Sequence, residues 1–224
     1  MIKAICFDLF FTLIIPAYDI ENNEFDIVNL SMREWERYAE ADYLYQERAL
    51  GLVRSEAEII EKIVAHIPFH VSDIQKEKLL IARENRMKKA LQSVSGNIIN
   101  VMEVLKSKNI KIGLISNADM IDCKYWKQSC LAPFFDDTIF SCNVGLLKPD
   151  EGIYELAMRH LDVLPGECLF VGDGGSNELY GAKKVGMKTV FTEALEIKSS
   201  EKRNSIIKNA DYHIRDFAEI LNYI

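Results

Sequence analysis

A single carboxylate, Asp8, ends a short apolar run near the start of the chain, in the stretch ICFDLFFTL. Further along, Ser116 and Asn117 follow a second apolar run, Lys148 follows a third and Asp173 follows a fourth. Each of these residues alone is common in a turn or at a helix start. Together they suit nucleophilic catalysis, because a carboxylate can attack and form a covalent intermediate while a lysine neutralises charge.

A third carboxylate, Glu178, follows Asp173 by five residues. Mg²⁺ prefers oxygen ligands and keeps part of its water shell, so two or three carboxylates are enough to hold it. Ser116 and the amides of a following helix could hold anionic oxygens. The residue types therefore predict a Mg²⁺ site beside Asp8 that handles a small anionic group.

The residues can meet only if the chain forms a parallel sheet. Five short apolar runs, nearly continuous in Ile, Val and Phe, and a weaker sixth at 211–214 are typical of strands covered on both faces. They span residues 2–8, 110–116, 137–142, 167–173, 188–192 and 211–214. Helical patterns alternate with them at 97–109, 150–161 and 177–186. The sequence therefore predicts an α/β fold with a doubly wound, mainly parallel Rossmann-like sheet, whose strand ends bring the polar residues to one edge.

Residues 16–94 break this alternation, because they are helical by periodicity and contain no strand pattern. We expect a small all-helical cap of three to five helices at 16–94, inserted into an α/β core formed by 1–15 and 95–224. Pro16 marks the expected entry, and the polar stretch 93–97 marks the exit.

The composition argues against several classes of protein. The 224 residues are 49% hydrophobic, which allows a full core. The net charge of −7 without a basic patch argues against nucleic-acid binding, and no apolar run reaches the ~18 residues of a membrane span. Five widely spaced cysteines without a C-x-x-C pair argue against zinc and a disulfide framework. With no signal-peptide pattern, we expect a cytoplasmic protein; the sequence carries no indication of its oligomeric state.

The polar residues named above lie in four stretches of the sequence: FDLFFTL, LISNA, LLKPDEGIY and FVGDGGSNELYGAKKVGM. In this order they resemble the four motifs of the haloacid dehalogenase-like hydrolase superfamily. The resemblance covers about residues 1–15 and 95–224. The helical segment between the first two motifs is similar to the cap of one subgroup of that superfamily.

The resemblance implies roles for individual residues. Asp8 would be the nucleophile that carries a covalent intermediate, and Lys148 would stabilise charge. Asp8, the backbone carbonyl of Phe10, Asp173 and Glu178 would hold Mg²⁺.

Three further residues are implied in binding the substrate or the transferred group, namely Thr12, Ser116 and Asn117. The cap would close over the site and exclude water. The implied substrate is a small anionic metabolite, in most cases a phosphorylated one.

One position departs from the phosphatase pattern. Phosphatases of this superfamily usually carry a second Asp two residues after the nucleophile, and here that position is Phe10. The next position, usually Gly, is Phe11. The second Asp protonates the leaving alcohol and later activates water, and losing such a group typically costs ~10²–10⁴-fold in rate.

Three interpretations stay open. The first is a Mg²⁺-dependent, phosphatase-like hydrolase whose leaving group needs little protonation, as in an acyl phosphate, or whose cap supplies the proton. The second is a metal-independent 2-haloacid dehalogenase, which would need Arg33 or Arg37 of the cap to clamp a carboxylate. The third is an inactive relative that binds a phosphorylated metabolite or a protein. The carboxylates Asp173 and Glu178 favour the first, because they preserve a metal site.

Overall fold

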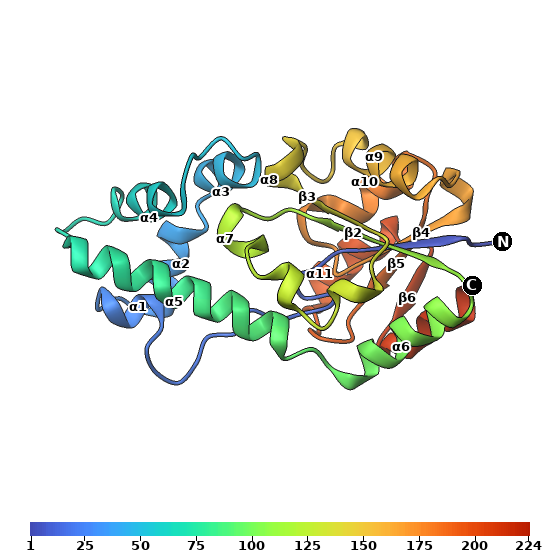
Figure 1. The fold of residues 1–224 in the computed structure, drawn as a ribbon, viewed down its shortest axis with the longest axis horizontal. Coiled ribbons are helices and arrows are strands. Elements are labelled where there is room, and N and C mark those ends of the chain that lie inside the picture. Colours follow the sequence, from blue (N-terminus) through green and yellow to red (C-terminus); the bar gives the residue numbers. More distant parts are fainter.

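The computed structural model describes residues 1–224 and contains one six-stranded sheet in which every pair of neighbouring strands is parallel (Figure 1). The strands are β1 (Ala4–Phe7), β2 (Lys111–Ser116), β3 (Asp137–Phe140), β4 (Cys168–Gly172), β5 (Lys188–Thr192) and β6 (Tyr212–Ile214). Their order is β3-β2-β1-β4-β5-β6, so the chain moves outward from β1 and then returns to β4 beside it. The predicted doubly wound α/β fold is confirmed, and its sheet is wholly parallel.

Helices cover both faces of the sheet. They are α6 (Gly96–Ser107), α7 (Met120–Cys123), α8 (Ser141–Val144), α9 (Glu151–Leu161), α10 (Glu178–Lys184), α11 (Ser200–Ile206) and six 3₁₀ segments, of which η6 (Phe217–Tyr223) is the longest. Helix α6 packs on one face of the sheet, where it contacts β2 and η6. Helices α9 and α10 pack on the opposite face. None of the helices combines the length and hydropathy that a membrane span requires.

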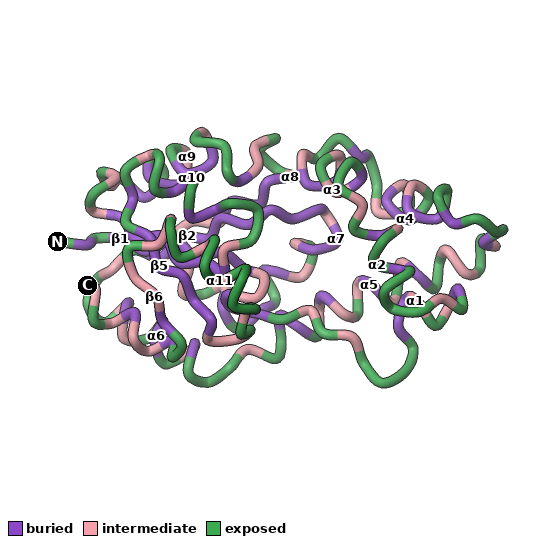
Figure 2. The backbone as a smooth tube through the Cα atoms, turned by 180° about the vertical axis from the view of Figure 1, so that it is seen from behind, coloured by how far each residue is buried: buried purple, intermediate pink, exposed green.

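The strands are buried on both sides, and β1 shows how. Ile5 and Phe7 belong to the hydrophobic cluster under α6, while Ala4 and Cys6 belong to the cluster under α9 and α10. Successive side chains of a strand point to opposite faces, so a strand covered on both faces must be apolar throughout. Figure 2 shows this as a buried centre running through the strands.

Five helices lie between β1 and α6 and are called the helical insertion. They are α1 (Glu24–Ile27), α2 (Met32–Ala39), α3 (Asp42–Ala49), α4 (Glu56–Val64) and α5 (Asp73–Gln92). The insertion has its own hydrophobic cluster around the fully buried Trp35. Ser72 caps the start of α5, because its hydroxyl accepts a hydrogen bond from the N–H of Gln75. The 20 residues of α5 lead back toward the sheet. The insertion lies at one end of the molecule, and both termini lie at the other (Figure 1).

Candidate active site

Asp8 lies where the winding of the sheet reverses. It follows β1, and Asp173 follows the neighbouring strand β4, so the two carboxylates meet although 165 positions separate them (173 − 8). The N–H of Asp8 donates a hydrogen bond of 2.9 Å to the carbonyl of Val171, which ties the two strand ends together. Ligands of open α/β sheets bind at this reversal point, so the fold itself places Asp8 at a binding edge.

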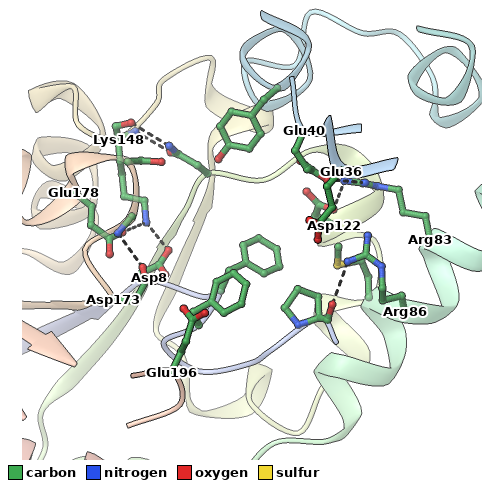
Figure 3. A pocket seen from close by; sticks show the side chains of 18 of the residues that line it. Asp8, Glu36, Glu40, Arg83, Arg86, Asp122, Lys148, Asp173, Glu178 and Glu196 are labelled. Atoms are coloured by element: carbon green, nitrogen blue, oxygen red, sulfur yellow. Dashed lines mark hydrogen bonds and ion pairs between the residues drawn. The ribbon is translucent and has the colours of Figure 1, made fainter. Parts of the chain in front are cut away.

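Lys148 is the central cation of this edge. Its Nζ lies 2.5 Å from Oδ1 of Asp8 and 2.6 Å from Oε2 of Glu178 (Figure 3). Asn117 fixes the backbone of Lys148, because its Oδ1 accepts the Lys148 N–H at 2.8 Å and its Nδ2 donates to the Lys148 carbonyl at 3.0 Å. The second and third motifs are therefore joined by two hydrogen bonds that aim the lysine at Asp8.

Glu178 reaches the site because Gly172 leaves room for it. A Cβ at Gly172 would lie 2.1 Å from Oε1 of Glu178, so any side chain there would displace the carboxylate. The same oxygen accepts a hydrogen bond of 3.1 Å from the N–H of Gly174. The glycines at the end of β4 and in the following turn thus hold the carboxylate of Glu178 in place, one by leaving space for it and one by a hydrogen bond.

Asp173 is held by a residue that has no counterpart in the sequence prediction. Its Oδ1 accepts the N–H of Gly175 at 3.0 Å, and its Oδ2 lies 2.6 Å from Nζ of Lys198. Lys198 also pairs with Glu196. It comes from the loop after β5, where no motif marks it, so only the fold reveals that it reaches the site.

The three buried acids carry more negative charge than Lys148 can balance. Burial raises the pKa of Asp8, although Lys148 opposes this effect. Burial and the nearby Asp8 raise the pKa of Glu178 to about 8. For Lys148 burial lowers the pKa, but the two carboxylates outweigh burial and hold it above its usual value. An added cation would relieve the repulsion between the carboxylates.

The donor set fits a divalent metal ion. One carboxylate oxygen from each of Asp8, Asp173 and Glu178 lies within 4.8 Å of the others. The carbonyl oxygen of Phe10 accepts no hydrogen bond from the protein, so it is free to serve as a further ligand. Carboxylate and carbonyl oxygens are the ligands that Mg²⁺ prefers.

A cavity of about 480 Å³ separates this cluster from the helical insertion. Figure 3 shows Asp8, Lys148, Asp173 and Glu178 on one side of it, and Arg83 and Arg86 on the other. The insertion also contributes Pro16, Tyr18, Glu36, Glu40, Tyr45 and Met87 to the lining. The cavity is of the size that takes a small metabolite.

The two arginines predicted to clamp a substrate carboxylate do not reach the cavity. Arg33 and Arg37 are exposed on α2 and do not line the cavity. Each stands two positions from the buried Trp35, and residues two apart on a helix point in different directions. The arginines that reach the cavity, Arg83 and Arg86, come from α5 and were missed because α5 carries no recognisable motif.

Arg83 is already neutralised by protein carboxylates. Its guanidinium lies 3.1 Å from Asp122, 3.2 Å from Asp119 and 3.4 Å from Glu40. The side chains of Arg83 and Asp119 are only 2% exposed. Burial, together with Asp119, raises the pKa of Asp122 to about 6. This network joins α5 of the insertion to α7 of the core, and it leaves Arg83 little free charge for a second anion.

The predicted substrate-binding residues separate into two groups. Asn117 lines the cavity, but Thr12 and Ser116 are fully buried and do not. Thr12 donates a hydrogen bond of 3.1 Å to Oδ2 of Asp8, so it orients the carboxylate from behind. The hydroxyl of Ser116 is buried at the end of β2 without a hydrogen-bond partner.

Phe10 and Phe11 form an apolar part of the cavity wall. Phe11 has a φ of +57°, in the left-handed region that favours glycine and costs a side chain roughly 1–2 kcal/mol. Its ring lies 5.4 Å from the ammonium of Lys198, within range of a cation–π contact. The backbone at Phe11 therefore keeps a conformation that favours glycine, although a phenylalanine occupies the position.

Tyr45 is a potential proton donor that the helical insertion contributes to the cavity, as Tyr18 is. Tyr45 lies on α3, lines the cavity, is half-buried, and its hydroxyl makes no hydrogen bond within the protein. Burial raises the pKa of Tyr45 to about 12, and both Lys148 and Asp8 lie close enough to influence it. The phenol therefore keeps its proton at neutral pH.

A family described as "Hydrolase: haloacid dehalogenase-like hydrolase" matches residues 2–186. Over 179 residues the chain is 30% identical to a glyceraldehyde 3-phosphate phosphatase of Methanothermobacter thermautotrophicus, covering 74% of this chain and 76% of that protein.

Solved structures share the fold. A dehalogenase structure superposes with a TM-score of 0.68 at 18% identity, covering 100% of this chain and 97% of the other. A HAD family enzyme of Bacteroides thetaiotaomicron, in complex with magnesium and inorganic phosphate, superposes with a TM-score of 0.67 at 19% identity, covering 90% and 98%.

Proposed function

Because the chain belongs to the haloacid dehalogenase-like hydrolases, we propose that it is a Mg²⁺-dependent phosphatase that acts on a small phosphorylated metabolite. The observation that carries this proposal is the cluster of Asp8, Asp173 and Glu178, whose oxygens come within 4.8 Å of one another at the reversal point of the sheet. The curated relative named above is a phosphatase of a three-carbon phosphate, which supports a phosphorylated substrate of that size.

Asp8, Asp173, Glu178 and the carbonyl of Phe10 would hold the metal ion. When bound, Mg²⁺ neutralises charge on the transferred phosphoryl group. The pairs with lysine leave the other oxygen of each carboxylate open to a metal ion, namely Oδ2 of Asp8, Oδ1 of Asp173 and Oε1 of Glu178.

Asp8 is the proposed nucleophile. One oxygen of its carboxylate attacks phosphorus, the bond to the leaving group breaks, and an aspartyl phosphate forms; water then attacks phosphorus and releases phosphate. Thr12 holds Oδ2 of Asp8 while Lys148 balances the negative charge at Oδ1. Asn117 keeps Lys148 in place. Ser116, whose buried hydroxyl has no partner, stays a prediction for contact with the phosphoryl group.

We propose that residues 16–94 act as a cap over the core formed by 1–15 and 95–224. The cavity between them would exclude water around the reacting groups when the cap is closed. Tyr45 reaches this cavity from the cap with its proton in place. It would donate that proton, or a hydrogen bond, to the leaving oxygen and so replace the acid missing at Phe10.

The dehalogenase interpretation has one observation in its favour, the aromatic residue at position 10. A halide leaves without a proton, so that enzyme would need no acid there. Against it, Arg33 and Arg37 do not reach the cavity, and Arg83 is engaged by three carboxylates. Halide release from 2-chloropropionate that persists in EDTA would reverse the preference.

A panel assay tests the proposed function. Phosphate monoesters and acyl phosphates of three to six carbons are incubated with Mg²⁺, and inorganic phosphate is measured for the wild type and for Asp8→Asn. The proposal predicts Mg²⁺-dependent release that the substitution abolishes. Release that is equal in the variant would contradict it.

A further inference from the structure

Two thiols lie close together at the boundary between the helical insertion and the sheet. The sulfur atoms of Cys123 and Cys142 are 4.0 Å apart, although 19 positions separate the residues. Cys123 ends α7, Cys142 lies in α8, and both are partly exposed. All five cysteines of the chain are free thiols in the structure, so this pair is reduced, adjacent and open to small oxidants.

The insertion packs on the segments that carry both thiols. Helix α7 contacts α5, and α8 contacts α3, as their places in Figure 1 also show. Asp122, the neighbour of Cys123, holds Arg83 of the insertion at 3.1 Å. The carbonyl of Cys142 packs against Gly51, where a Cβ would lie 2.1 Å from that oxygen and where φ is +71°. A movement of either sulfur therefore reaches the face on which the insertion docks.

The two sulfurs are also chemically unequal. The thiol of Cys123 beside it lowers the pKa of Cys142, which increases the thiolate fraction, and the thiolate is the nucleophile in thiol oxidation. In the same arrangement the pKa of Cys123 is raised, so Cys142 has the larger thiolate fraction of the two.

The chain contains its own comparison pair. Cys6 and Cys168 lie 3.7 Å apart, but both are fully buried in the neighbouring strands β1 and β4. Hydrogen bonding to Cys168, together with burial, raises the pKa of Cys6. The sulfur–sulfur distances of the two pairs are thus similar, while access and thiolate character differ. Cys130 is exposed but has no sulfur near it.

We propose that Cys123 and Cys142 form a reversible disulfide when the protein meets a peroxide, and that this bond slows turnover by shifting the docking face of the insertion. The Cys142 thiolate attacks one peroxide oxygen, the O–O bond breaks, and hydroxide leaves to take up a proton as water. Cys123 then attacks the resulting sulfenic sulfur, and a second water leaves. Two electrons pass from the two thiols to the peroxide, and a dithiol returns them.

The bond requires a local rearrangement. A disulfide brings its sulfurs to ~2.05 Å, which is roughly half of the present separation. Because α7 carries Asp122 and α8 supports Gly51, closing the pair displaces contacts from two helices of the insertion at once. Disulfides of this kind inside cells are typically transient and redox-sensing rather than structural.

Peptide mapping tests the modification itself. The intact protein is treated with hydrogen peroxide, free thiols are blocked with N-ethylmaleimide, and peptides are identified by mass spectrometry. We expect a peptide pair linked through Cys123 and Cys142, with Cys6 and Cys168 still alkylated after denaturation. Cys130→Ser should leave the link intact, and Cys142→Ser should remove it. Absence of the linked pair in the wild type would overturn the proposal.

The activity readout rests on the proposed function, whereas the mapping does not. We expect oxidised wild type to release phosphate severalfold more slowly, dithiothreitol to restore the rate, and Cys123→Ser to be insensitive to peroxide. A linked pair with unchanged turnover would overturn the effect on the docking face. Reduced protein that shows no phosphatase activity would contradict the proposed function alone, and the mapping would still decide whether the disulfide forms.

Discussion

Nζ of Lys148 lies 2.6 Å from Oε2 of Glu178, and each of the two side chains is only 2% exposed. The same ammonium also holds Asp8 at 2.5 Å, so one cation serves two buried carboxylates. Burial and Asp8 raise the pKa of Glu178 to about 8 in spite of this contact. The site is therefore short of positive charge until a cation or the proton of Glu178 supplies it.

The first prediction is that Mg²⁺ affinity rises with pH. A metal ion binds the ionised carboxylate, and Glu178 carries a proton below a pKa of about 8, so binding must displace that proton at lower pH. Calorimetric titration should show a dissociation constant that falls between pH 6 and pH 8.5. Glu178→Gln should bind more weakly and with a flatter pH profile. Wild-type affinity that is constant over this range would contradict the role of Glu178.

The second prediction concerns the missing acid. Phe10→Asp places a carboxyl group where the resemblance expects the acid–base residue, and such groups contribute ~10²–10⁴-fold. Turnover of alkyl phosphates, whose leaving groups need a proton, should rise by ~10-fold or more, while that of acyl phosphates should change little. Phe10→Leu is the matched control, because it removes the ring without adding an acid. Equal alkyl phosphate rates in the two variants would mean that a carboxyl group at position 10 adds nothing to the proton supplied by Tyr45.

The third prediction is that Tyr45 of the helical insertion protonates the leaving oxygen. Tyr45→Phe removes only the hydroxyl, so alkyl phosphate turnover should fall by ~10²-fold if that group protonates the leaving oxygen. Acyl phosphate turnover should be nearly unaffected, because its leaving group needs little protonation. Tyr43→Phe on the same helix is the control, since Tyr43 is exposed and does not line the cavity. A uniform loss on both substrate classes would instead indicate a binding role.

The fourth prediction concerns stability. Arg83→Met leaves Asp119 and Asp122 buried without their main cation, and breaking a buried ion pair costs ~3–5 kcal/mol. The loss should shrink at pH 5, because burial raises the pKa of Asp122 to about 6 and protonation then removes its charge. Urea unfolding at pH 5 and pH 8 measures both effects. Arg54→Met, at an exposed position, should change stability by less than ~0.5 kcal/mol at either pH.

The sheet could be predicted from the sequence because its central strands are buried on both faces. They therefore appear as nearly continuous apolar runs, such as the six-residue β2, whereas the three-residue edge strand β6 is only partly buried and gives a weaker pattern. Predicting the strands also predicts where they end, and therefore that Asp8, Lys148 and Asp173 lie close together. The short helices α7 and α8 were not predicted, since four residues are too few to show a helical period.

The groups contributed by the insertion and by loops could not be predicted in the same way. Lys198 and Tyr45 belong to no motif, and their places depend on how a loop and a helix pack against the sheet. Arg33 and Arg37 are exposed on α2 and do not line the cavity, and the sequence shows that an arginine is present but not which face of the helix it occupies. Thr12 was placed at the substrate, whereas the structure turns its hydroxyl toward Asp8.

The central claim is that Asp8 carries the phosphoryl group during turnover. Acid quenching of the wild-type enzyme with Mg²⁺ and a rapidly cleaved acyl phosphate, followed by peptide mapping, measures this directly. The account predicts a peptide containing Asp8 that is heavier by one phosphoryl group, and no such peptide from Asp8→Asn or in EDTA. Phosphate release at an undiminished rate by Asp8→Asn, or a phosphoryl group found on another residue, would contradict it.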